Sequence, residues 1–147
     1  MSLKDKILAD MKTAMREKDA SRLESIRMLR AAVQRVEVDE QAEIGDDQVL
    51  GIVEKQIKQS KDAISQFLSG DRQDLADKEQ VHVDNLMAYL PEQLSDDDIA
   101  AAVTSAISEV GAESMKDMGK VIGLLKGRLQ GQADMGKVSG IVKSKLS

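Results

Sequence analysis

The spacing of the apolar residues constrains the fold of this chain more than any other feature of its sequence. One series recurs every four residues and consists of Leu3, Ile7, Met11 and Met15. A second series, at spacings of three and four, runs through residues 20–40. Both periods match one face of an α-helix, and no stretch of useful length alternates as a half-buried strand does. We therefore predict an all-α protein.

Capping residues indicate where several of these helices begin and end. Ser2, with Asp5 three residues later, is typical of a helix N-terminus. Gly70 follows the apolar residues of a third helix and is expected at its C′ position, the first residue beyond the end. Gly111 is expected to end a later helix in the same way. A fourth helix is predicted over about residues 72–90.

Pro91, the single proline, marks the expected boundary between two lobes. Proline disfavours helix at the preceding residue and lacks a backbone donor. Ser95 with Asp98 then resembles a capping box that starts a new helix. The sequence thus predicts an N-terminal lobe of helical hairpins, a hinge and a small C-terminal lobe of three helices. Their expected ranges are 1–90, 91–95 and 96–147.

The composition of the chain excludes several classes of functional site. The chain has 147 residues, no cysteine and one histidine, which excludes disulfides and thiolate metal sites. No glycine-rich phosphate loop follows a strand, so no nucleotide site is indicated. The N-terminus lacks the apolar run of a signal peptide, and no segment reaches the ~20 apolar residues of a membrane span. We expect a cytoplasmic protein with no cofactor, no metal and no membrane partner.

The densest pattern lies near the C-terminus. Residues 36–113 carry a net charge of −14, whereas residues 114–147 carry +5 and hold six of the ten glycines. Gly119, Gly123 and Gly127 recur every four residues, and Gly131 continues the spacing. Each glycine inside a helix costs ~1 kcal/mol relative to alanine, so this repeat needs a physical reason.

Two explanations fit the glycine repeat. The glycines could let another helix pack closely, or they could let a phosphate backbone or a partner approach. The interleaved cations favour phosphate, which lysine and arginine bind without sequence preference. Aromatic residues for base stacking are absent nearby, so a folded RNA fits better than a single strand. The candidate contact residues are Lys116, Gly119, Lys120, Gly123, Lys126, Arg128 and Lys137.

Two other groups of polar residues are candidate sites. Arg27, Arg30 and Gln34 flank the apolar stripe of the second helix, where ion pairs with the acidic third and fourth helices are the expected role and ligand binding is the alternative. Glu79 and His82, three residues apart, could exchange protons as a general acid and base. A single histidine at a helix interface is more often a hydrogen-bonded packing residue. We therefore predict no catalytic residue.

Three separated motifs resemble the GatB/YqeY family. They are SIRMLRAAV at residues 25–33, YLPEQLSDDDI at 89–99, and KDMGKVIG with GQADMGKVSGIVKSKL between 116 and 146. The chain is similar to a stand-alone YqeY-type protein and to the tail of the B subunit of glutamyl/aspartyl-tRNA amidotransferase. The resemblance implies an all-α fold with two helical lobes.

The same resemblance implies a role near tRNA. In the amidotransferase the similar tail contacts tRNA, while the chemistry takes place in other parts of the enzyme. We therefore expect a tRNA-binding or amidotransferase-related accessory module that is not catalytic alone. Its expected partners are tRNA and the aminoacyl-tRNA or amidotransferase machinery. The alternatives are a component of a carbon–nitrogen ligase that uses glutamine as amide donor on misacylated tRNA, and a helical protein–protein adaptor without an RNA role.

Overall fold

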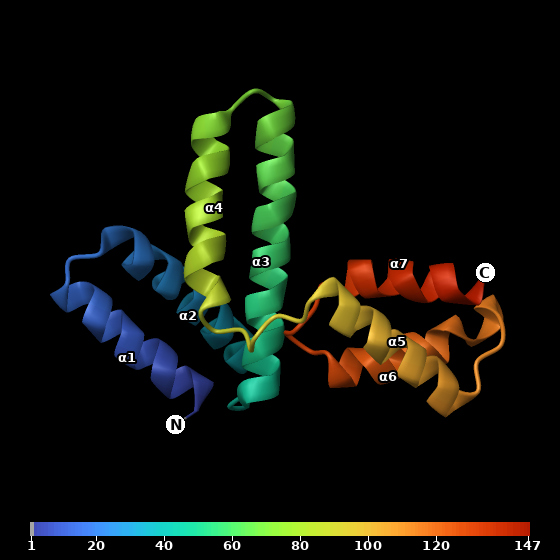
Figure 1. The fold of residues 1–147 in the computed structure, drawn as a ribbon. Helices are drawn as coiled ribbons and strands as arrows, with labels where there is room; N and C mark the ends of the chain where they lie inside the picture. Colours follow the sequence, from blue (N-terminus) through green and yellow to red (C-terminus); the bar gives the residue numbers. More distant parts are fainter. Residues whose placement is uncertain (1) are drawn as a thin grey trace. The chain divides into compact units, whose positions relative to one another are not determined.

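A computed structural model describes residues 2–147 of the chain. These residues form seven α-helices and one turn of 3₁₀-helix, and they include no strand, which confirms the all-α prediction (Figure 1). The helices are α1 (Leu3–Arg16), α2 (Ala20–Glu40), α3 (Asp46–Ser69), α4 (Gln73–Met87), α5 (Asp96–Val110), the 3₁₀ turn η1 (Met115–Asp117), α6 (Met118–Arg128) and α7 (Met135–Leu146).

The helices belong to two compact units, Met1–Leu90 and Pro91–Ser147. We call them the N-terminal unit, which contains α1 to α4, and the C-terminal unit, which contains α5 to α7. Each unit has a hydrophobic core of its own.

In the N-terminal unit, α3 and α4 form a long antiparallel hairpin against which α1 and α2 pack (Figure 1). The fully buried side chains of this core are aliphatic and include Ile7, Ile26, Leu29, Val49, Val53 and Leu86. Not every apolar residue of these helices is buried. Met15 at the end of α1 is 51% exposed and Leu68 at the end of α3 is 50% exposed, and neither belongs to the core of this unit.

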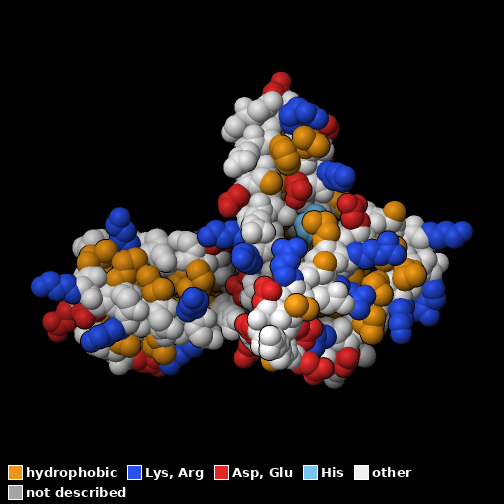
Figure 2. All heavy atoms as spheres, turned by 180° about the vertical axis from the view of Figure 1, so that it is seen from behind, with side chains coloured by type: hydrophobic (Ala, Val, Ile, Leu, Met, Phe, Trp, Pro, Cys, Tyr) orange, Lys and Arg blue, Asp and Glu red, His pale blue; other side chains and the backbone are white. Residues whose placement is uncertain are grey.

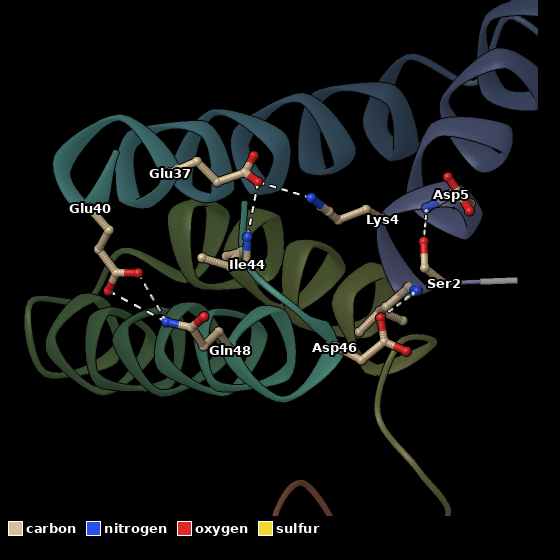
Figure 3. A network of polar contacts seen from close by, with 9 residues as sticks. Ser2, Lys4, Asp5, Glu37, Glu40, Ile44, Asp46 and Gln48 are labelled. Carbon is tan, nitrogen blue, oxygen red and sulfur yellow. Dashed lines mark hydrogen bonds and ion pairs between the residues drawn. The ribbon is translucent and has the colours of Figure 1, made fainter. Parts of the chain in front are cut away.

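A network of hydrogen bonds and one ion pair links the start of α1 to the connection between α2 and α3 (Figure 3). Lys4 Nζ lies 2.9 Å from Glu37 Oε2, which also accepts the backbone N–H of Ile44 at 3.1 Å. Asp46 Oδ1 accepts the N–H of Leu3 at 2.9 Å. The Lys4 ammonium and the Ile44 amide hold the pKa of Glu37 below its usual value.

The expected caps are confirmed at Ser2, which accepts the N–H of Asp5, and at Gly111, which has φ 66°. The prediction for Gly70 is wrong, because Gly70 has φ −90° and Asp71 takes the left-handed conformation, with φ 58°. The N–H of Arg72 then bonds the carbonyl of Phe67 at 2.8 Å, and that of Asp71 bonds Leu68 at 3.2 Å. This is a Schellman motif whose left-handed residue carries a side chain.

Helix α4 ends at Met87, three residues before its expected end. The chain turns through Ala88 to Leu90, since the residue before Pro91 avoids helical geometry. The Tyr89 hydroxyl donates a hydrogen bond to Asp10 Oδ2 at 2.8 Å, which fixes this turn against α1. Burial and the neighbouring Asp10 carboxylate raise the pKa of Tyr89 above its usual range.

The C-terminal unit is a three-helix bundle around Val103, Val121, Leu125, Val138 and Val142, all fully buried. The segment after Pro91 is attached to this bundle. Gln93 Nε2 donates to the Gly131 carbonyl at 2.6 Å, and the N–H of Leu94 donates to the Gln132 carbonyl at 2.9 Å. Two residues of the predicted hinge are therefore held by the loop between α6 and α7.

Candidate nucleic-acid interface

Helix α6 buries one face and leaves the other open. Val121 and Leu125 are fully buried, and Leu129 just beyond the helix is 5% exposed. Residues on a helix advance by about 100° each, so these three define a core-facing side. The glycines of the repeat lie on the opposite side.

We define the glycine strip as Gly119, Gly123 and Gly127. All three are exposed, and a Cβ atom built on any of them would meet nothing within 4 Å. Close packing of another helix of this unit on the strip is therefore excluded among the described residues. Gly131 does not belong to the strip, because it lies in the loop after α6 with φ 76°.

Cations border the glycine strip on both sides. In helical projection Lys126 and Lys120 fall about 20° beyond its two edges, and Lys116 lies one turn earlier, in η1. All three side chains are exposed. Among the described residues none of them forms an ion pair. The open face of α6 thus presents bare backbone between free ammonium groups.

The other two predicted cations already have partners. Arg128 Nη1 lies 2.6 Å from Glu109 Oε2 of α5. The ammonium of Lys137, on α7, forms an ion pair with Asp96 at the start of α5. Both pairs are largely exposed, so each contributes little and can be exchanged for another anion. The structure therefore separates Lys116, Lys120 and Lys126, which are free, from Arg128 and Lys137, which are paired.

Helix α7 repeats the pattern more weakly. It buries Val138 and Val142 and exposes Gly136 and Gly140. Taken as a whole, the C-terminal unit has seven Lys and Arg against eight Asp and Glu, a net charge of −1. Its basic character is therefore local to the faces of α6 and α7, while Asp96, Asp97 and Asp98 gather at the start of α5.

The sequence did not reveal the surroundings of His82. Its Nδ1 lies 2.8 Å from Ser25 Oγ of α2, and Asn85 Nδ2 donates to the same oxygen at 3.1 Å. Ser25 is only 3% exposed, so no substrate can reach its hydroxyl. The histidine is thus a hydrogen-bonded packing residue that links α4 to α2.

The ion pairs expected for Arg27 and Arg30 are absent from those formed within residues 2–147. Arg30 Nη1 instead lies 3.1 Å from Met11 Sδ of α1, and Arg27 is exposed, as is Gln34. In that same part of the chain no three His, Asp or Glu side chains are grouped to hold a metal ion. None of its helices is long and apolar enough to cross a membrane.

The chain is similar to several fungal proteins. It is 33% identical to the protein named "Altered inheritance of mitochondria protein 41, mitochondrial" of Pyrenophora tritici-repentis, over 84% of this chain and 71% of the relative. The protein of the same name from Lachancea thermotolerans is 33% identical over 69% of this chain and 56% of the relative. An uncharacterized protein of Schizosaccharomyces pombe is 31% identical over 63% of this chain and 72% of its own length.

These matches identify the family of the chain and do not identify an activity. The match covers only about half of the length of some relatives, 56% in one and 44% in another, and their names place them in mitochondria. The cytoplasmic location expected from the sequence stays a prediction. The sequence also matches the family described as Yqey-like protein over residues 4–146, which is nearly the whole chain. The chain therefore belongs to the YqeY-like (GatB/YqeY) family.

Proposed function

We propose that this protein is a tRNA-binding accessory module, related to the amidotransferase machinery and not catalytic alone. The observation that carries the proposal is the open glycine strip of α6 between the free ammonium groups of Lys120 and Lys126. The strip has no packing role within its unit, so its cost in helix stability lacks an internal reason.

A phosphate backbone would make use of this face. Glycine has no side chain, so a phosphodiester can come within contact distance of the helix backbone. The flanking ammonium groups then neutralise phosphates as mobile point charges. Figure 2 shows lysine and arginine side chains distributed over the visible part of the C-terminal unit. Such contacts follow the shape and backbone of a folded RNA and do not read its bases.

The expected affinity is modest. The whole chain has a net charge of −5, which opposes the approach of RNA. We therefore expect dissociation constants of roughly 10⁻⁴–10⁻⁶ M at physiological salt, the range of non-specific binding. Screening limits the opposing field to about 8–10 Å, so the local face of α6 still governs contact.

The test is a tRNA titration at several salt concentrations, with wild type and a Lys120→Glu, Lys126→Glu double variant. Loss of two phosphate contacts should weaken binding and lower the slope of log K against log salt by about 2. A Lys143→Glu, Lys145→Glu variant makes the same change of net charge on the last turn of α7. This control should lose less affinity and keep most of the slope.

Two results would overturn the proposal. One is no binding of wild-type protein to tRNA at low salt. The other is an equal loss of affinity and slope in the double variant and its control, because binding would then follow net charge and not the α6 face.

A second candidate function is a protein–protein adaptor, which the exposed apolar residues of the first two helices favour. Met15 is 51% exposed, Met28 50% and Val38 73%. Single exposed apolar residues are common on protein surfaces, but several on two helices that pack together can form the contact surface of a partner. Co-purification of the tagged protein, with RNA and protein both identified, distinguishes the two functions. Recovery of a stoichiometric protein without RNA, lost on Met28→Lys, would favour the adaptor.

A further inference from the structure

Helix α2 carries a second stripe of residues on the side away from the core. The stripe consists of Glu24, Met28, Ala31, Arg35 and Val38, all exposed. Their spacings of four and three place them within an arc of about 80°. The buried residues Ser25, Ile26, Leu29 and Val33 occupy the other side of the helix. In Figure 2, apolar and basic side chains are interleaved on the visible face of the N-terminal unit.

The first four residues of this stripe follow the order negative, apolar, apolar, positive, and the apolar Val38 comes after them. Glu24 and Arg35 form no ion pair within the part of the chain that the structure describes. Between them lie Met28, which is 50% exposed, and the small Ala31. Spacings of three and four with apolar residues at the centre are typical of a helix that packs along another helix.

This order is complementary to itself when one copy is reversed. We propose that α2 pairs with α2 of a second copy of the chain, antiparallel about a two-fold axis that passes between Met28 and Ala31. Met28 of each copy then packs on Ala31 of the other, whose small side chain allows close approach. Glu24 of each copy faces Arg35 of the other, which gives two equivalent ion pairs. A parallel pair would instead place like charges opposite each other.

The proposed contact is small. The two ion pairs lie about 16 Å apart along the helix, since eleven residues rise 1.5 Å each. One helix–helix contact of this length falls below the ~1,200 Å² of a standard interface. We therefore expect a reversible dimer that depends on protein concentration. This inference does not rest on tRNA binding.

Charge reversal provides a sharp test by sedimentation velocity of the full chain over a wide concentration range. Glu24→Arg and Arg35→Glu should each shift the protein toward monomer, because each places like charges at both ends of the contact. Mixing the two variants in equal amounts should restore a dimer, now a heterodimer with both ion pairs re-formed. Lys58→Glu, an exposed substitution on α3 that changes the net charge by the same amount as Arg35→Glu, should leave dimerisation unchanged.

The mixing experiment is independent of any effect on folding, because each variant is judged by its ability to pair with the other. Wild type that stays monomeric at every concentration would overturn the proposal, and the stripe would then belong to a different protein partner. A dimer that neither single variant weakens would also overturn it, since the contact would lie elsewhere on the chain.

Discussion

Replacing the glycine strip with alanine should make the protein more stable and, at the same time, a poorer ligand for tRNA. Gly119, Gly123 and Gly127 lie on α6, and a Cβ atom at each would meet nothing within 4 Å. Alanine is therefore accommodated without strain, and each substitution in a helix interior gains about 1 kcal/mol. Gly119 and Gly127 lie in the first and last turns of α6, where the gain is smaller. The expected total for the triple variant is roughly 2 kcal/mol.

The assay is urea unfolding followed by circular dichroism, with tRNA titration of the same samples. Gly51→Ala is the matched control. Gly51 lies inside α3, and its added Cβ atom also meets nothing within 4 Å, so it should gain about 1 kcal/mol without any change in tRNA binding. The triple variant should be more stable than wild type and bind tRNA more weakly, because three methyl groups hold the phosphates away from the helix.

Either half of this expectation can fail. A triple variant that is no more stable than wild type would show that the outer face of α6 is not open, which refutes the structural reasoning. A variant that gains stability and keeps full tRNA affinity would show that the glycines contact no phosphate, and the proposed function would lose the observation that carries it.

Three further predictions concern the N-terminal unit. Asp71→Gly should raise the free energy of unfolding by about 1 kcal/mol in urea, because glycine adopts the left-handed conformation without a Cβ penalty; a loss of stability would contradict this. The pKa of Glu37 is lowered from 4.5 by Lys4, so its contribution is present above pH 4.5 and is lost as the pH falls through the lower folded value. Stability of Glu37→Gln should therefore decline less on acidification than that of wild type, and parallel pH curves would count against the pair. His82→Ala should cost about 1–2 kcal/mol, because the buried hydroxyl of Ser25 loses a partner; an unchanged unfolding midpoint would show that this bond contributes nothing.

The helices themselves could be predicted because local signals agree with one another. The residue range expected for the second helix, 20–40, matches α2, and the cap at Ser2 forms as expected. The end of α3 could not be placed correctly, because glycine is only a preference at a left-handed position. Its last turn closes one residue later than expected, and Asp71 takes that conformation. The local sequence thus indicates that a helix ends here but not at which residue.

The candidate interface was predictable only in part. Repetition of glycine every four residues could be read directly, and the positions of Val121 and Leu125 on the same helix already indicate that the glycines face away from the core. The partners of Arg128 and Lys137 could not be read, since they lie on α5 and depend on how three helices pack. The same holds for Ser25 and His82, which are 57 residues apart and meet only through tertiary structure.

The attachment of Gln93 and Leu94 to the loop between α6 and α7 determines where this protein can be cut. A fragment that starts at Asp96, where α5 begins, would leave the carbonyls of Gly131 and Gln132 without their donors and would remove the Leu94 side chain from the core. A fragment that starts at Glu92 retains all three contacts. A fusion of the C-terminal bundle to an unrelated protein should therefore begin at Glu92, so that the bundle keeps the segment of Gln93 and Leu94 that binds its α6–α7 loop.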